Sequence, residues 1–172
     1  VCSSDLDVTY KEGKQEGQAT KWHNNDQKSG ECIYKNGQLD GPYTTWHENG
    51  KKEEEGNFKN GQLEGLATLW HENGQKAGEV TYKDGNQEGL AIKWHDNGEK
   101  EAEINYKEGK QEGPYSKWHE NGQKLEEGAF KNGQLEGLAT LWYDNGEKEA
   151  EITYKDGKQE GSYTKWHKNG QK

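Results

Sequence analysis

The chain has 172 residues and a formal net charge of −9 at pH 7, and 26% of its residues are hydrophobic. This acidic composition, with no basic block, argues against binding to nucleic acid or to anionic membrane lipids, and no apolar run approaches the roughly 20 residues of a membrane span. A composition so poor in apolar residues is typical of disordered chains, but seven tryptophans and nine tyrosines, mostly at fixed spacing, indicate an ordered repeat array with a thin core.

The first six residues match nothing later in the chain, whereas residues 7–13 already follow the pattern that residues 79–85 repeat. Two interpretations of this leader are open. Either Cys2 is the lipidated first residue of a bacterial lipoprotein, although Val1 suits such a cleavage site poorly, or the leader is non-native, because the end of a common sequencing adapter encodes these six residues. We expect the second, in a metagenomic fragment. We predict an unmatched leader over residues 1–6 and one repeat domain over residues 7–172, with partial units at both ends and no assignable compartment.

The repeat is marked by seven tryptophans that stand 24 residues apart, without insertion or deletion. A fixed period of this length is the signature of a repeat array. A glycine stands five residues before every tryptophan, and a lysine stands six residues after it. The tryptophans are Trp22, Trp46, Trp70, Trp94, Trp118, Trp142 and Trp166.

Each unit contains two turn signals that separate two short segments rich in Thr, Val, Ile and aromatic residues, which is the pattern of hairpins in series. The first turn typically reads Glu-Asn-Gly-Gln, and the second reads Lys, then Asp, Asn or Glu, then Gly. In the first unit Asp26 replaces the turn glycine, which is tolerable because Asp can adopt the left-handed conformation. The predicted fold is all-β: an elongated single sheet of tandem β-hairpins, with about fourteen strands, twisted and curled.

The register of the hairpins depends on which side chains share a face, because a one-residue slip exchanges the faces. A three-residue Glu-Asn-Gly loop, a type I turn with the glycine in a bulge, sets Trp70 directly opposite Lys76 and lets the lysine stem cover that indole. The opposite face, with Ala67, His71 and Glu79, is expected to be largely solvated. The face of the indole is predicted to hold Leu66, Thr68, Trp70, Lys76, Gly78, Val80 and Tyr82.

A continuous aromatic spine is predicted along the array. Equivalent residues of successive units lie roughly 10 Å apart across two strands, so the aromatic residue of the intervening strand is expected between neighbouring indoles. With the seven tryptophans, these residues form the candidate binding face. They are Tyr34, Phe58, Tyr82, Tyr106, Phe130 and Tyr154.

The unit, Gly-x-Ala-Thr-x-Trp-His-Glu-Asn-Gly-Gln-Lys followed by Glu-x-x-Tyr-Lys-Asp-Gly, resembles the bacterial MORN-repeat variant, a relative of the membrane occupation and recognition nexus repeat. The resemblance covers residues 7–172. It implies a β-hairpin array that acts in protein interaction or at the cell surface, and bacterial members are often labelled as the antitoxin of a toxin–antitoxin pair. The chain departs from that pattern by carrying His after most tryptophans where the family usually has Tyr, which returns at Tyr143.

The residues that could carry chemistry have simpler explanations. Tetrahedral zinc needs ligand nitrogens within about 2.1 Å of one ion, which histidines repeating at roughly 10 Å cannot provide. Residues 84–88 alternate oxygen ligands but lack the calcium-loop pattern. A ladder of identical carboxylates is typical of a solvated face rather than of one catalytic constellation. We therefore expect no metal, no cofactor and no catalytic residue, and we expect Cys32 to be a small core residue.

Two classes of function remain open. In the first, the array is a scaffold that binds a protein partner by many weak, repeated contacts. In the second, it binds carbohydrate or cell wall, which requires bare tryptophan faces. Because covered indoles are expected here, the first class is favoured, and indole exposure discriminates between the two. The sequence also predicts end-to-end self-association, because edge strands near Val8 and Trp166 leave backbone groups unpaired.

Overall fold

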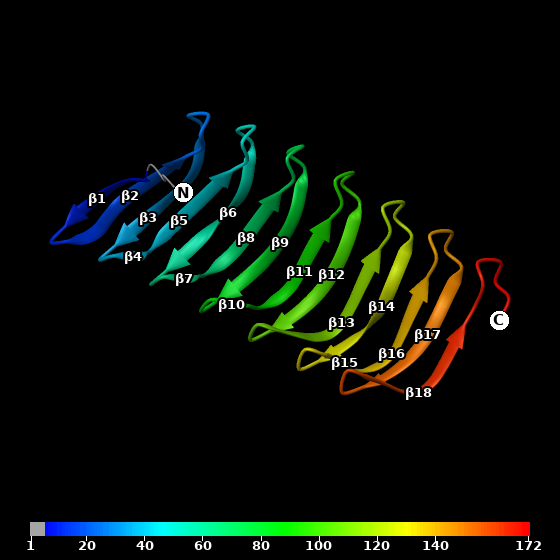
Figure 1. Cartoon of the computed structure of the whole chain (residues 1–172). Coiled ribbons are helices and arrows are strands. Elements are labelled where there is room, and N and C mark those ends of the chain that lie inside the picture. The colour runs from blue at the N-terminus through cyan, green and yellow to red at the C-terminus, as the bar shows by residue number, and fades with distance from the viewer. Residues whose placement is uncertain (1–5) are drawn as a thin grey trace. The chain divides into compact units, whose positions relative to one another are not determined.

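The computed structural model describes residues 6–172. Of the leader predicted over residues 1–6, residues 1–5 lie outside the described part, and Leu6 begins the first strand. Every regular element of residues 6–172 is a β-strand, so none of them is a helix that could span a membrane, and the all-β prediction is confirmed (Figure 1). The strands are β1 (Leu6–Lys11), β2 (Lys14–Trp22), β3 (Lys28–Lys35), β4 (Gln38–Leu39), β5 (Gly41–Trp46), β6 (Lys52–Lys59), β7 (Gln62–Leu63), β8 (Gly65–Trp70), β9 (Lys76–Lys83), β10 (Asn86–Gln87), β11 (Gly89–Trp94), β12 (Lys100–Lys107), β13 (Lys110–Trp118), β14 (Lys124–Lys131), β15 (Gln134–Leu135), β16 (Gly137–Trp142), β17 (Lys148–Lys155) and β18 (Lys158–Lys165).

The chain divides into two compact units between Asn86 and Gln87, and each is described by itself. In the first unit, strands β1–β9 pair antiparallel in the order of the chain. Strands β11–β18 do the same in the second unit. Short strands such as β7 precede longer ones such as β8 after a break of one residue, here Glu64. The predicted tandem hairpins, two strand positions for each repeat, are therefore confirmed (Figure 1).

The turn that follows each tryptophan, the upper turn, is the predicted three-residue loop. The His71 N–H donates to the Gln75 carbonyl at 2.9 Å, and the Gly74 N–H donates to the His71 carbonyl at 2.8 Å. Gly74 has φ +88°, as the bulge position of such a loop requires. Asp26 takes the same place in the first repeat with φ +60°, so the expected exception is confirmed.

The second turn of each repeat, the lower turn, is a two-residue loop in which both central residues have positive φ. Asn60 at +50° and Gly61 at +80° join Lys59 to Gln62, which lie opposite each other. Two successive positive φ values define a type I′ turn, and Asn and Asp tolerate that conformation better than other non-glycine residues. Local backbone demand therefore explains why Asn or Asp precedes the glycine in most repeats.

A β-bulge after the upper turn overturns the predicted register. Trp70 lies opposite Lys76, as predicted, but Leu69 lies opposite Gly78, so Ala77 is an extra residue on the second strand. One extra residue moves every later side chain of that strand to the other face. Val80 and Tyr82 consequently share a face with Ala67 and not with Trp70, and the predicted register is wrong beyond the turn. The same shift occurs in the hairpins of Trp22, Trp46, Trp94, Trp118 and Trp142.

Each hairpin therefore has two distinct faces. The Trp face holds the residues aligned with Trp70, which in that repeat are Leu66, Thr68, Lys76, Glu79 and Thr81. The Ala face holds the residues aligned with Ala67, which are Leu69, Gly78, Val80 and Tyr82. The prediction that the face of Ala67 is solvated is wrong: Ala67 is 1% exposed and Val80 is 9% exposed. Glu79, predicted beside Ala67, lies on the Trp face.

The Ala face is packed by cross-strand pairs of complementary size. Ala67 lies opposite Val80, whereas Tyr43 lies opposite Gly56. The Tyr43 ring covers Gly56 so closely that a Cβ on this glycine would lie 2.8 Å from the ring carbon Cε1. Cys32 occupies the position of Gly56 in the first hairpin, partly buried, and burial raises the pKa of its thiol. Its predicted role as a small core residue is consistent with this setting.

Two tyrosines bury their hydroxyls on the Ala face against carboxylates. Tyr43 Oη donates to Glu54 Oε1 at 2.6 Å, and Tyr115 Oη donates to Glu126 Oε1 at 2.6 Å. Burial first, and then these hydrogen bonds, raise the pKa of both tyrosines above the usual value of about 10. Each hydroxyl is therefore a neutral donor over the physiological pH range.

Candidate functional site

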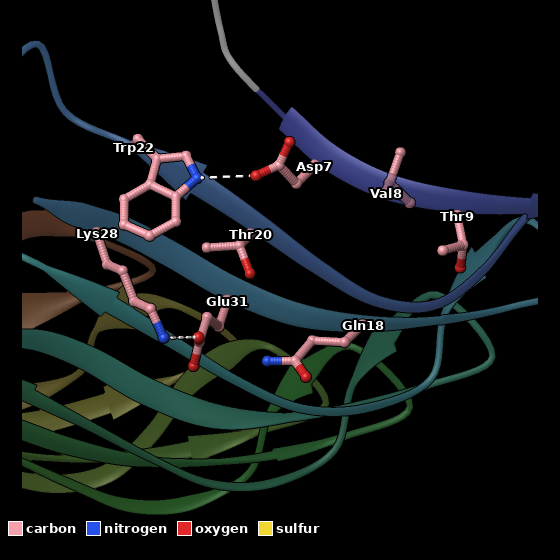
Figure 2. A pocket seen from close by; sticks show the side chains of 8 residues that line it. All are labelled: Asp7, Val8, Thr9, Gln18, Thr20, Trp22, Lys28 and Glu31. Atoms are coloured by element: carbon pink, nitrogen blue, oxygen red, sulfur yellow. Dashed lines mark hydrogen bonds and ion pairs between the residues drawn. The ribbon is translucent and has the colours of Figure 1, made fainter. Parts of the chain in front are cut away.

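The Trp face carries one lysine–glutamate pair in each hairpin. Lys76 Nζ lies 2.5 Å from Glu79 Oε1, although three residues separate the two in sequence. In a regular strand such residues point to opposite faces, and the bulge at Ala77 brings them to the same one. The pairs are solvent-exposed, so each contributes about 0–1 kcal/mol and mainly sets the direction of the lysine. The other pairs are Lys28–Glu31 (Figure 2), Lys52–Glu55, Lys100–Glu103, Lys124–Glu127 and Lys148–Glu151.

Four lysines cover the indole of the following repeat and not the indole opposite them, whereas Lys172 lies over the indole of its own repeat, Trp166, at 5.3 Å. Lys52 Nζ lies 5.5 Å from the ring centroid of Trp70, and Lys148 Nζ lies 5.3 Å from that of Trp166. A cation over an indole at this distance contributes about 0.5–1 kcal/mol at an exposed site. The expectation that the lysine covers its own hairpin's tryptophan is therefore wrong for these repeats. The same contact joins Lys100 to Trp118 and Lys124 to Trp142, both at 5.6 Å.

The histidine after the tryptophan connects neighbouring repeats through the main chain. His47 Nε2 donates to the Trp70 carbonyl oxygen at 2.8 Å, and His119 Nε2 donates to the Trp142 carbonyl oxygen at 3.1 Å. Tyr143 stands in the histidine position, and its Oη donates to the Trp166 carbonyl at 2.8 Å. His and Tyr are thus interchangeable here because each reaches the same carbonyl with one donor. The equivalent bonds of His23 and His95 measure 2.7 and 2.9 Å.

The turn asparagine has a double role. Asn49 Oδ1 accepts from the Lys51 N–H at 3.0 Å within its own upper turn. Its Nδ2 donates to the Glu72 carbonyl of the following upper turn at 2.8 Å. The Trp-His-x-Asn motif therefore holds one repeat against the next.

An acidic residue connects the lower turns in the same way. Glu64 Oε2 accepts from the Asp84 N–H of the following lower turn at 2.9 Å. The main chain adds a parallel contact, because the Gly85 N–H donates to the Leu63 carbonyl at 3.0 Å. Glu112 and Asn132 repeat the carboxylate contact at 2.7 Å in the second unit. Within each unit, both ends of a hairpin are therefore attached to the next repeat by hydrogen bonds.

The predicted aromatic spine does not form. The tryptophans line the Trp face, and those after Trp22 are half-buried. The other aromatic residues of the predicted spine lie on the Ala face, since each pairs with the glycine that precedes the tryptophan by five residues. Two of them contact core tyrosines there: Phe58 lies against Tyr43 at a centroid separation of 4.9 Å, and Phe130 lies against Tyr115 at 4.7 Å. The residues that leave the predicted face are Tyr34, Phe58, Tyr82, Tyr106, Phe130 and Tyr154.

The Trp face also exposes an apolar residue that sequence reasoning did not single out as a site. Leu66 is 55% exposed, Leu90 is 46% exposed and Leu138 is 54% exposed. In two other repeats Pro42 and Pro114 occupy this position and are exposed as well. The recurrence of Leu or Pro directly after the repeat glycine is the sequence signal that could have identified this position.

No group of three or more His, Cys, Asp or Glu residues within residues 6–172 is placed to hold a metal ion.

A family model described as MORN repeat variant matches five segments of the chain, residues 39–60, 63–84, 87–108, 111–132 and 135–156. Together these segments make up more than half of the 172 residues. Each begins near the start of a tryptophan strand and ends in the following lower turn. A comparison with curated proteins finds no match. The similarity is therefore to the repeat itself.

Proposed function

The chain belongs to the MORN repeat variant family, and from this premise we propose that it is a non-catalytic repeat scaffold that binds a protein partner along its Trp face. The observation that carries the proposal is an exposed apolar residue at the same position of successive repeats, because Leu66 in the first unit and Leu90 and Leu138 in the second are each about half exposed on the Trp face of their own hairpin. Large apolar side chains that recur exposed at one position of the repeat, in a protein this polar, are typical of an interaction surface. The histidine and asparagine that follow the tryptophan, by contrast, already hydrogen-bond to neighbouring repeats.

A partner would contact the same exposed position in several successive repeats. The first unit offers Pro42 and Leu66, and the second offers Leu90, Pro114 and Leu138, each at the same place in its repeat. Burying the exposed half of one leucine contributes about 1 kcal/mol, a roughly fivefold change in affinity. Several such contacts on one chain add up because the later ones are intramolecular. We therefore expect strength to grow with the number of repeats engaged.

Carbohydrate binding is the weaker candidate. A sugar ring stacks on a bare indole, whereas lysines lie over the indoles of Trp70, Trp118, Trp142 and Trp166 at 5.3–5.6 Å. The exposed apolar residue that recurs on the Trp face is leucine or proline, neither of which offers a flat π-face. The covered indoles thus favour the protein partner.

Within this function we propose a toxin protein as the partner to test first, because the motif resembles proteins labelled as antitoxins. A cell-surface scaffold is the alternative setting for the same face. Neither setting requires a catalytic residue, a metal or a cofactor.

Titration calorimetry with the protein encoded beside this gene tests the proposal. The variants are Leu66→Ser and Leu138→Ser, singly and together, with Thr81→Ser as the control on the same face. We expect each leucine substitution to weaken binding roughly fivefold, the pair to weaken it further, and the control to have no effect. A pull-down on isolated cell walls provides the carbohydrate comparison.

One result would exclude the scaffold interpretation. If a single Trp→Ala substitution abolished binding while the leucine pair did nothing, the partner would occupy one pocket and not a repeated face. Retention on cell walls that free oligosaccharide displaces would favour the carbohydrate alternative. The unfolding midpoint of each variant, measured in parallel, separates loss of binding from loss of fold.

A further inference from the structure

Asparagine followed by glycine recurs in two different settings of the array. Asn49 with Gly50 lies in an upper turn, and Asn60 with Gly61 lies in a lower turn, and both asparagines are exposed. Asparagine is a thermolabile residue, and a following glycine leaves its own nitrogen unhindered for attack on the side-chain amide carbon, because it has no Cβ. The two kinds of turn therefore present one reactive pair in two geometries.

In the upper turns the side-chain amide is held at both of its polar atoms. Asn49 Oδ1 accepts from the Lys51 N–H at 3.0 Å, and its Nδ2 donates to the Glu72 carbonyl at 2.8 Å. The turn is also crowded, since a Cβ on Gly50 would lie 3.2 Å from Gln27 Oε1 of the preceding repeat. The amide carbon can therefore turn toward the glycine nitrogen only after two hydrogen bonds break. The same two bonds hold Asn97, Asn121 and Asn145.

In the lower turns the side-chain amide is not held. Asn60 makes no side-chain hydrogen bond within residues 6–172, and only its main-chain N–H is bound, to Asp40 Oδ2 at 3.3 Å. A Cβ on Gly61 would meet no atom within 4 Å, so this turn has room for a ring to form. The side-chain amides of Asn36 and Asn132 likewise have no hydrogen-bond partner in the part of the chain that the structure describes.

The attacking nitrogen, by contrast, is held equally in the two settings. The Gly61 N–H donates to the Leu39 carbonyl at 2.7 Å, and the Gly50 N–H donates to the His47 carbonyl at 2.9 Å. Both nitrogens must leave a main-chain hydrogen bond before they can react. The difference between the two turns therefore lies in the side-chain amide.

We propose that the lower-turn asparagines Asn36, Asn60 and Asn132 are sites of spontaneous deamidation and that the upper turns protect theirs. At Asn60 the Gly61 nitrogen bonds to Cγ, the Cγ–Nδ2 bond breaks, and ammonia leaves with the proton of the Gly61 N–H. Water then opens the resulting succinimide at one of its two ring C–N bonds. Cleavage beside Cγ gives aspartate, and cleavage beside the main-chain carbonyl carbon gives isoaspartate, without any oxidant or reductant.

The two products affect the lower turn differently. Asp84 and Asp156 already hold this position at φ +49° and +50°, against +50° for Asn60, so aspartate preserves the turn. Isoaspartate carries the main chain through the former side chain and lengthens the two-residue loop by one methylene. The hydrogen bonds of the Asn60 and Gly61 N–H groups to the preceding lower turn are then lost. Isoaspartate therefore loosens the attachment between two repeats.

Peptide mapping by mass spectrometry tests the assignment on the 172-residue chain after incubation at mildly alkaline pH. Digestion with pepsin at acidic pH prevents further reaction during the analysis. We expect the mass gain from amide to acid at the three lower-turn asparagines to be at least about tenfold faster than at the four upper-turn ones, because two hydrogen bonds must break in the upper turns. The matched control is the same chain in urea, where both kinds of pair should react at similar rates because the turns are unfolded.

The variant Asn60→Asp provides the second readout, because it has the charge of the deamidated chain with the ordinary linkage. We expect it to unfold like the parent, whereas aged chain with isoaspartate at this position should have an unfolding midpoint lower by roughly 4–8 °C, since two hydrogen bonds are lost. Three results would each overturn the proposal. They are equal rates at upper and lower turns of the folded chain, no lower-turn reaction while the chain in urea reacts fully, and equal midpoints for the isoaspartate form and Asn60→Asp.

Discussion

The packing of Tyr43 over Gly56 makes the sharpest stability prediction. Gly56→Ala places a methyl group 2.8 Å from Cε1 and 3.0 Å from Oη of the buried Tyr43 ring. The ring is held by its hydrogen bond to Glu54 and by contact with Phe58, so it cannot move aside freely. We expect a loss of about 1–3 kcal/mol, as overpacking of a core typically costs.

Gly30→Ala is the matched control. Gly30 also lies within a strand, without positive φ, and a Cβ there meets nothing closer than 3.9 Å. Replacing glycine at such a position removes freedom from the unfolded chain, which stabilises by about 0.4–1 kcal/mol. The two substitutions, identical in chemistry, should therefore shift stability in opposite directions. Urea unfolding followed by tryptophan fluorescence measures both.

A compensating change tests the reason for the loss. Tyr43→Ala with Gly56→Val reproduces the pair that Ala67 and Val80 form one repeat later. Tyr43→Ala alone should cost about 3–5 kcal/mol by leaving a cavity, and the double variant should recover part of that, with a coupling of about 0.5–3 kcal/mol. The reasoning fails if Gly56→Ala destabilises no more than Gly30→Ala. It also fails if the stability change of the double variant equals the sum of the changes caused by Tyr43→Ala alone and Gly56→Val alone.

Four further outcomes are expected. His119→Tyr should leave stability nearly unchanged in thermal unfolding, because Tyr143 shows that tyrosine reaches the same carbonyl, whereas His119→Phe should cost about 0.5–1.5 kcal/mol. Gly98→Val should destabilise more than Gly98→Asp in urea, because this turn position has φ +85° and Asp26 already adopts its equivalent. Above pH about 10, where unfolded tyrosines ionise while Tyr115 stays protonated, stability should fall as pH rises, and Tyr115→Phe should reduce that slope in pH-dependent unfolding. A three-repeat fragment should melt well below a six-repeat one in calorimetry, and equal midpoints would contradict nearest-neighbour coupling.

The amino-acid sequence by itself determined the period, the hairpins and both turns. These depend on local backbone demands that single residues meet, such as positive φ at Gly74 and at Asn60 with Gly61. It also placed Trp70 opposite Lys76, because the loop length alone sets the first pair after a turn. The sequence also showed that His usually follows the tryptophan, with Tyr only at position 143. It did not show that both side chains donate to the same main-chain carbonyl of the following repeat.

Only the tertiary structure decided which face is buried. The bulge residue is Ser, Glu, Ala or Leu in different repeats, as at Ser29, Glu53, Ala77 and Leu125, so no residue type marks it. The extra residue brings Val80 to the same face as Ala67, so the two can be buried together only when the bulge is present. The same cause moved Tyr82 away from the tryptophans. Lys52, Lys100, Lys124 and Lys148 cover the next indole and not their own. The sequence of one hairpin does not show this, because the tryptophan that completes the contact belongs to a neighbouring repeat.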